Sequence, residues 1–308
     1  MRKPLVVIVG PTAVGKSEVA IELANRINGE IVSCDSRQVY KHLNIGTAKP
    51  TKKERKKIRH HLIDIIEPDD EFNAFLYAQK ARKAISKVHR KKKIPILIGG
   101  AGLYIRAVID GIFLGAGKNE KIRKRLEKEI EKFGSKHLHQ RLKRVDPETA
   151  SRLHPHDKVR IIRALEVYEL TGQPISALQK ISRGKRPNYD LLMIGLKRER
   201  KELYRRINQR AERMIKKGLV KEIESILKKG FSKDLPALKG LGYKEIIGYL
   251  DGECDLKETI HLLKRNTRRF AKRQLTWFNK DKRIHWIEIA KKNSTTKVTS
   301  QIIEMLKC

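Results

Sequence analysis

Cysteine is scarce in this 308-residue chain, which contains three of them. Cys34, Cys254 and Cys308 are an odd number at wide spacing, so they do not form the disulfide framework that staples small secreted proteins. No pair of cysteines stands near the histidine-rich stretches, and the sequence therefore predicts no zinc finger. A reducing compartment suits such a chain, and we expect it to be cytoplasmic.

Long hydrophobic runs are missing as well. The first apolar stretch, residues 5–9, is far shorter than the roughly 20 residues that a membrane-spanning helix requires. We therefore expect no membrane partner. Apolar residues still make up 39% of the chain, which is enough to fill a core. The length exceeds that of one compact domain and favours a principal domain with a smaller second unit.

Acidic residues are half as numerous as basic ones, 35 against 71, which leaves a formal charge of +36 and a pI near 10.2. Such a field attracts polyanions, of which nucleic acid is the commonest and an anionic membrane surface the second candidate. Lysine runs such as residues 91–93 are equally typical of solvated surfaces. Net charge alone does not separate these readings.

Short β-branched runs indicate buried strands at residues 5–9, 30–34, 62–66, 94–98, 191–196 and 284–289. Helix-like stretches alternate with the first four, for example 18–27 and 74–88, and this alternation predicts an α/β fold with a mostly parallel sheet flanked by helices. After Gly115 and Gly117 a charged helical region without a strand begins. We expect a core formed by residues 1–117 and 186–308, with basic helices near the C-terminus, and an inserted all-helical domain at 118–185.

The apolar run 5–9 leads directly into a P-loop and then an amphipathic helix. The motif consists of Gly10, Pro11, Thr12, Ala13, Val14, Gly15, Lys16 and Ser17. Its backbone N–H groups and the helix N-terminus form a phosphate cradle, Lys16 adds a positive charge, and the Ser17 hydroxyl is a ligand for phosphate-bound Mg²⁺. A P-loop alone most often indicates a nucleotide-binding kinase or NTPase, because it does not specify which phosphates it holds.

Asp35 follows the second predicted strand, at the sheet edge where ligands of such folds bind. Its position is compatible with three roles: a capping carboxylate, a water-mediated contact to Mg²⁺, or a general base. Position alone favours capping.

Several motifs, in order along nine-tenths of the chain, together resemble the tRNA dimethylallyltransferase family. They are the P-loop, Asp35-Ser36-Arg37-Gln38-Val39-Tyr40, Gly46-Thr47-Ala48-Lys49-Pro50, His60-His61-Leu62-Ile63-Asp64, Gly99-Gly100-Ala101-Gly102-Leu103-Tyr104, the block from Asp146-Pro147 to Ser176, Gly242-Tyr243-Lys244-Glu245, and residues 267–278. A P-loop protein of another family does not carry this series, so the resemblance is specific.

The resemblance implies transfer of a dimethylallyl group from dimethylallyl diphosphate to the N6 amine of the adenosine 3′ of the tRNA anticodon. It implies that the P-loop, with Arg206 and Arg210, binds the diphosphate, that Asp35 is the general base, and that Mg²⁺ assists. The residues that it places against tRNA are Asp35, Ser36, Arg37, Gln38, Ala101, Arg123, Val159, Arg160, Ile161, Ile162 and Arg163. We expect a monomer that binds the anticodon stem-loop.

Three positions depart from the family pattern. Ala101 replaces a usual threonine, so no hydroxyl can act there; His156 replaces an asparagine and Asn279 an arginine. Two of the implied contacts have a structural alternative. Ile161 and Ile162 are more typical of a core than of a nucleotide contact.

Residues 264–283 contain nine basic residues and one acidic residue. Leu263, Phe270 and Trp277 recur every seven residues, which predicts an amphipathic helix whose apolar stripe packs on the core. Its basic side chains Arg265, Arg268, Arg269 and Lys272 would then face RNA phosphates, or alternatively pair with acidic groups of the protein.

Arg206 and Arg210 stand four residues apart on a predicted helix. For them, too, ion pairing with neighbouring glutamates is the alternative to binding the diphosphate. Two other functions account for the P-loop: a small-molecule kinase, and an RNA-binding module without catalysis. Neither accounts for the motifs around Asp35, Gly46 and Trp277 together.

Overall fold

The computed structural model describes residues 3–111, 117–183, 188–290 and 295–307. Gly115, Cys308 and the expected domain boundary at 185 and 186 lie outside the described residues. The chain forms two compact units. The first comprises Met1–Val108 and Asn188–Cys308, and the second comprises Ile109–Pro187.

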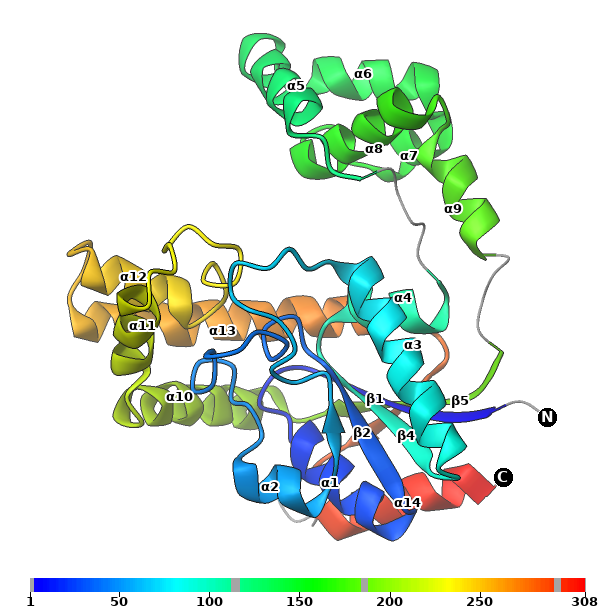
Figure 1. Ribbon diagram of the computed structural model, residues 1–308, viewed down its shortest axis with the longest axis vertical. Coiled ribbons are helices and arrows are strands. Elements are labelled where there is room, and N and C mark those ends of the chain that lie inside the picture. The colour runs from blue at the N-terminus through cyan, green and yellow to red at the C-terminus, as the bar shows by residue number, and fades with distance from the viewer. Residues whose placement is uncertain (1–2, 112–116, 184–187, 291–294, 308) are drawn as a thin grey trace. The chain divides into compact units, whose positions relative to one another are not determined.

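The first unit is built on a six-stranded sheet in the order β3-β2-β4-β1-β5-β6, with every described pair parallel (Figure 1). The strands are β1 (Lys3–Val9), β2 (Gly29–Cys34), β3 (His60–His61), β4 (Ile94–Gly99), β5 (Tyr189–Lys197) and β6 (Ile284–Glu288). Because parallel neighbours need crossover connections, helices separate most of the strands, and the α/β fold expected from the alternating pattern is confirmed.

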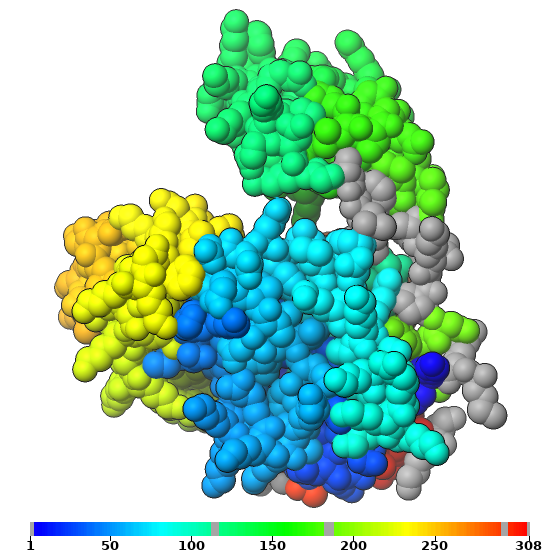
Figure 2. Space-filling model, in the orientation of Figure 1, coloured from blue at the N-terminus to red at the C-terminus, as the bar shows by residue number. Residues whose placement is uncertain are grey.

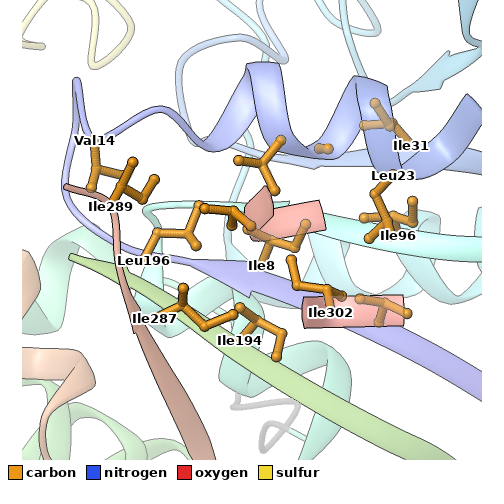
Figure 3. Packing of buried hydrophobic residues seen from close by; sticks show 14 of the residues in the cluster. Ile8, Val14, Leu23, Ile31, Ile96, Ile194, Leu196, Ile287, Ile289 and Ile302 are labelled. Atoms are coloured by element: carbon orange, nitrogen blue, oxygen red, sulfur yellow. The ribbon is translucent and has the colours of Figure 1, made fainter. Parts of the chain in front are cut away.

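Helices of this unit cover the sheet, and some lie beyond the carboxyl ends of its strands. They are α1 (Lys16–Arg26), α2 (Lys52–Lys57), α3 (Ala74–Arg90), α4 (Gly102–Ile109), α10 (Arg200–Lys216), α11 (Leu219–Lys228), α12 (Tyr243–Leu250), α13 (Leu256–Phe278) and α14 (Thr295–Lys307). α1 packs against α14, and α3 packs on β2 and β4. Val14 of the P-loop joins the hydrophobic core beside Ile289, which anchors the loop to β1, α1 and the end of β6 (Figure 3).

The strand expected at residues 62–66 is wrong. The structure has the two-residue β3 at His60–His61, and Leu62 and Asp64 adopt left-handed backbone with φ of 64° and 57°. Two such residues interrupt an extended chain. Leu62 and Ile66 are nevertheless buried. The apolar run at residues 62–66 therefore correctly indicated buried side chains, although these residues do not form a strand.

The second unit contains only helices among its described residues. They are α5 (Glu120–Phe133), α6 (Ser135–Val145), α7 (Pro147–Arg152), α8 (Lys158–Thr171) and α9 (Ile175–Arg183). Asp146 begins α7 by accepting the Thr149 N–H at 2.9 Å, and Pro147 occupies the first helical position. Side chains such as Leu126, Leu138 and Leu165 form a separate hydrophobic core.

Candidate active site

The P-loop turns sharply between β1 and α1. Gly10 and Gly15 have positive φ, and a Cβ at Gly10 would come within 2.5 Å of the Leu196 carbonyl oxygen, so this position requires glycine. Ala13 also adopts positive φ, at 64°. The turn delivers the chain to the N-terminus of α1, where free backbone N–H groups favour an anion.

Basic side chains hold the carbonyl oxygens of this loop. Lys16 Nζ donates to the carbonyls of Gly10 and Pro11 at 3.0 and 2.8 Å, and Arg206 Nε donates to that of Ala13 at 2.9 Å. Arg198, which the sequence analysis did not single out, donates to the Val14 carbonyl at 2.7 Å. These bonds fix the loop and place three cations beside it.

A cavity of about 820 Å³ lies against the loop, entirely within the first unit. From the P-loop it is lined by Thr12, Ala13, Gly15, Lys16 and Ser17, whereas Gly10, Pro11 and Val14 do not line it. The expected site residues Asp35, Ser36, Arg37, Gln38, Ala101, Arg206 and Arg210 complete much of its wall. Segments that are far apart in the sequence therefore line one cavity.

Positive charge is concentrated at the P-loop end of this cavity. Burial, and then the neighbouring charge of Arg210, lower the pKa of Lys16 from 10.5 to about 8. Burial also lowers the pKa of Arg210, while the charges of Asp35 and Glu18 act in the opposite direction on both groups. A bound diphosphate would supply the negative charge that these cations lack.

Asp35 caps the turn after β2 with one of its oxygens. Oδ1 accepts the backbone N–H of Arg37 at 2.8 Å and that of Gln38 at 3.3 Å. The helix cap considered from the sequence is not formed, because these bonds close a turn and the next helix, α2, begins at Lys52. Because Oδ1 makes both bonds, Oδ2 is the oxygen that can face a substrate proton or a metal-bound water in the cavity.

The neighbours of Asp35 are held by long-range bonds. Arg37 donates through Nη1 to the carbonyls of Pro236 and Ala237, the latter at 3.3 Å. Gln38 accepts from the Ser33 hydroxyl at 3.0 Å and donates from Nε2 to the carbonyl of Thr47 at 3.2 Å. These side chains form a rigid wall around the carboxylate.

The donor set at the P-loop fits a magnesium ion that is bound mainly through phosphate and water. Ser17, Glu18 and Asp35 present oxygen atoms to the cavity, and oxygen is the ligand that Mg²⁺ prefers. Across the described residues no group of three or more His, Cys, Asp or Glu side chains could hold a metal ion by itself.

A second glycine-rich segment, residues 99–102, lies beside the P-loop and is joined to it through α13. Gln274 accepts the Thr12 N–H at 2.8 Å and donates to the Gly100 carbonyl at 3.0 Å. A Cβ at Gly102 would collide with the Trp277 ring. Ala101 lines the cavity, and its carbonyl oxygen is 3.9 Å from the Cys34 sulfur.

The apolar stripe of α13 packs on the core only at Leu263, which is 2% exposed. Leu263, Phe270 and Trp277 all line the cavity, together with Gln274, and the Trp277 side chain is 39% exposed. Ala271, on another face of this helix, joins the hydrophobic core. A seven-residue repeat identifies one face of a helix, but it does not show whether that face meets side chains or an empty cavity.

The basic side chains of α13 differ from one another. Arg268 donates to Asn208 Oδ1 at 2.8 Å and lies over the Tyr204 ring at 5.9 Å, so it is engaged within the protein. Arg269 and Lys272 are exposed. Arg265 has a buried Nε for which the described residues provide no hydrogen-bond partner.

The arginines expected to contact tRNA from the second unit are ion-paired. Glu166, fully buried, accepts two bonds from Arg123 at 2.8 and 2.9 Å and one from Arg163 at 2.6 Å. Arg160 pairs with Asp157 at 3.0 Å. The side chains of Arg123, Arg163 and Arg160 are nevertheless 29%, 33% and 65% exposed.

Three apolar residues of α8 were also expected to touch tRNA. Val159 is 80% exposed and is accessible to a partner. Ile161 and Ile162 are 0% and 8% exposed and belong to the core of this unit, so the expectation that their side chains contact nucleotides is corrected. No helix among the described residues is long and apolar enough to cross a membrane.

Comparisons with known proteins cover nearly the whole chain. The family model described as IPP transferase matches residues 38–281. A protein of Halothermothrix orenii named tRNA dimethylallyltransferase is 50% identical over 287 residues, which are 93% of this chain and 88% of the relative. Its counterpart in Pelotomaculum thermopropionicum is 51% identical over 289 residues, covering 94% and 91%.

Solved structures agree with these sequence relatives. The full-length tRNA isopentenylpyrophosphate transferase of Bacillus halodurans has a TM-score of 0.74 at 40% identity, covering 99% of this chain and 97% of that one. A eukaryotic dimethylallyltransferase acting on tRNA has a TM-score of 0.81 at 26% identity, covering 99% and 80%. Both likenesses extend over the two units described above.

Proposed function

The chain belongs to the IPP transferase family, the tRNA dimethylallyltransferases, and we propose that it transfers a dimethylallyl group from dimethylallyl diphosphate to the N6 amine of the adenosine 3′ of the anticodon. One observation carries the proposal: a single cavity joins the P-loop after β1, with its cations, to the carboxylate of Asp35 after β2, on the far side of β4 in the same sheet. A kinase needs the first of these features. It does not account for the family motifs around Asp35, Gly46 and Trp277, which line this same cavity together.

The donor occupies the P-loop end in this proposal. Backbone N–H groups at the start of α1, with Lys16, Arg206 and Arg210, bind the diphosphate. As the allylic carbon–oxygen bond breaks, its electron pair leaves with the diphosphate, and the surrounding positive charge stabilises the developing anion. Ser17 would hold a Mg²⁺ ion, which would supply further neutralisation of charge on the leaving group.

The acceptor adenine enters from the other end, after leaving the stack of the anticodon loop. Its N6 forms the new bond to the allylic carbon while Asp35 Oδ2 accepts the amine proton, so that charge and protons balance. Ser36, Arg37, Gln38 and Ala101 form the wall against which the base rests. The bonds made by Asp35 Oδ1 hold the carboxylate in one orientation for this task.

The remaining tRNA contacts are assigned to exposed basic surface. Arg269 of α13 and the outward parts of Arg123, Arg160 and Arg163 are accessible to phosphates, as is the side chain of Val159. We place the enzyme in the cytoplasm, where its tRNA substrate is, and expect it to act as a monomer because the cavity is complete within one chain.

The test is to incubate the protein with labelled dimethylallyl diphosphate and unmodified tRNA in Mg²⁺ buffer without any nucleoside triphosphate. We expect label in tRNA that carries adenosine 3′ of the anticodon, and none in the same tRNA with guanosine there. Label that appears only when ATP is supplied would favour a kinase-like reaction. Label in both tRNAs would refute the assignment of the acceptor atom.

A further inference from the structure

The carboxylate of Glu222 in α11 binds three consecutive backbone amides. Asn44 N–H donates to Oε2 at 3.0 Å, Ile45 N–H donates to Oε2 at 2.8 Å and to Oε1 at 3.0 Å, and Gly46 N–H donates to Oε1 at 3.3 Å. These residues lead into the Gly46–Pro50 motif, for which the proposed mechanism has no direct role. Glu222 itself does not line the cavity.

Tyr243 completes the arrangement from the start of α12. Its hydroxyl donates to Glu222 Oε1 at 2.8 Å, and its ring is fully buried. Burial, and then the charge of Glu222, raise the pKa of Tyr243 far above the usual range, so the hydroxyl remains a donor. A Cβ at Gly46 would come within 2.5 Å of this ring, so the motif requires glycine where it meets Tyr243.

A carboxylate suits this position because it only accepts hydrogen bonds. Its two oxygens provide about four lone-pair sites, enough for three N–H groups and one hydroxyl. Glutamine has the same shape but presents one oxygen and an NH₂ group, which would point a donor at backbone donors. The contact therefore requires the charge of Glu222 and not only its size.

The segment held in this way continues directly to Gln38. The carbonyls of Thr47 and Ala48 accept from Gln38 Nε2 at 3.2 and 3.4 Å, and the Gln38 N–H donates to Asp35 Oδ1 at 3.3 Å. Gln38 is thus positioned by the loop on one side and by the carboxylate turn on the other. In Figure 2 the yellow surface of residues near 230 lies against the blue surface of the segment near 42, where Lys229 Nζ is 3.2 Å from His42 Nδ1.

From these contacts we infer that Glu222 is a positioning residue for prenyl transfer: by holding the amides of residues 44–46 it orients Gln38, and with it the acceptor wall beside Asp35. The inference rests on the proposed function. It gives the Gly46–Pro50 and Gly242–Glu245 motifs a common purpose, since one carboxylate joins them. The proposed diphosphate site lies at the opposite end of the cavity, so substitution of Glu222 should not alter the affinity for diphosphate.

The first experiment compares Glu222→Gln with Glu224→Gln, the same substitution two residues further along α11. Glu222→Gln should lower the single-turnover rate of prenyl transfer by about 10- to 100-fold, the effect of a displacement near 1 Å at a reacting group. Its dissociation constant for inorganic pyrophosphate should stay within about twofold of the wild-type value. Glu224→Gln, which has no bond to residues 44–46, should match the wild type in both measurements.

The second experiment is a double-mutant cycle with Gln38→Ala. If Glu222 acts through Gln38, the double variant should be no slower than the slower single variant, because the interaction is already lost. Rate losses that multiply would show independent roles and overturn the inference. If thermal melts show that Glu222→Gln is unfolded, Tyr243→Phe removes one hydrogen bond without changing the packed ring and enters the same cycle.

The outcomes separate this inference from the proposed function. A wild-type protein that transfers no prenyl group to tRNA overturns the proposed function, and the inference fails with it. A wild type that transfers, beside an equally fast Glu222→Gln variant, overturns the inference alone. A Glu222→Gln variant with weakened pyrophosphate binding and an unchanged rate would also contradict it.

Discussion

The two units use arginine in opposite ways. In the first, Arg206 and Arg210 lie with Lys16 along one cavity. Arg206 has one ion pair, with Glu18 at 3.5 Å, and among the described residues no carboxylate is within ion-pair distance of Arg210. In the second, Arg123 and Arg163 surround one fully buried carboxylate, Glu166. The first group has an excess of positive charge that a ligand must balance, whereas the second is balanced by the protein itself.

The pKa shifts of the two groups express the same difference. Burial lowers the pKa of Lys16 to about 8, because its charge is insufficiently compensated. Burial raises the pKa of Glu166, but hydrogen bonds from Arg123, from the Asn119 N–H and from Arg163 outweigh it and hold the value at about 2. A buried cation without an ion-pair partner indicates a binding site, and a buried anion with several cationic partners indicates a structural role.

The largest expected effect belongs to the cavity. Asp35→Asn should lower the single-turnover rate of prenyl transfer by roughly two to four orders of magnitude, because the amide cannot accept the N6 proton. Folding should be unaffected, since an Asn oxygen can accept the same two backbone N–H groups and is itself a good cap.

A thermal melt and a pyrophosphate titration are the controls for Asp35→Asn. Both should match the wild type. If prenyl transfer remains near normal, Asp35 is not the base, and its function is limited to the turn that it caps.

In the second unit, removing the buried charge of Glu166 should lower the stability of the folded protein. Glu166→Ala leaves Arg123 and Arg163 without their buried partner, and we expect it to lower the free energy of unfolding by about 3 kcal/mol. The depressed pKa of Glu166 means that its contribution is present above about pH 4.5 and is lost as the pH falls toward 2. The difference between wild type and variant should therefore shrink over that interval.

Thermal and urea melts of the full chain measure this difference. The control is Glu148→Ala, whose side chain is exposed and pairs with Lys180 at the surface of the same unit. It should change stability by less than about 1 kcal/mol. A Glu166→Ala protein as stable as the wild type would remove the contrast between the two groups of arginines.

The lowered pKa of Lys16 leads to a smaller effect on binding. A diphosphate favours the protonated lysine, so above about pH 8 its binding must take up a proton, and affinity should fall as the pH rises. We expect the dissociation constant of inorganic pyrophosphate to increase about tenfold between pH 7 and pH 9. Isothermal titration at fixed ionic strength would measure it.

Lys16→Ala separates the lysine from the titration of pyrophosphate itself. The variant should bind more weakly at pH 7 and should retain only the pH dependence of the ligand. An identical pH dependence in wild type and variant would show that Lys16 is charged throughout the range.

Much of the fold follows from local patterns. The β-branched runs identify β1, β2, β4, β5 and β6, because buried parallel strands are apolar on both faces. The run at 62–66 misleads because Leu62 and Asp64 are left-handed, and nothing in their residue types demands that conformation. The family motifs, by contrast, bring together the residues that line the cavity.

The supporting residues could not be found in this way. Glu222 acts on amides 176 to 178 positions earlier in the chain, and Gln274 bonds an amide 262 positions away. Partners at such distances depend on the tertiary fold. Gln274 belongs to the 267–278 motif, but the motif does not identify its partners, and Glu222 lies outside every motif. The stripe on α13 was recognised from its period, but which surface it faces depended on where α10 and the P-loop lie.

The smallest expected effect concerns two adjacent arginines on α13, and it applies the same contrast within one helix. Arg268 is engaged with Asn208 and Tyr204, whereas Arg269 is exposed. If exposed, unpaired cations bind the phosphates, Arg269→Ala should reduce the slope of log affinity for tRNA against log salt by about one unit. Arg268→Ala should change that slope less and lower thermal stability more, because its loss removes a hydrogen bond and a cation–π contact.

Binding titrations from about 50 to 300 mM salt, with melts of both variants, compare the two. Equal slopes for both would mean that Arg268 leaves its partners to bind RNA, and that an ion-pair or hydrogen-bond partner in the free protein does not exclude a basic residue from the tRNA interface.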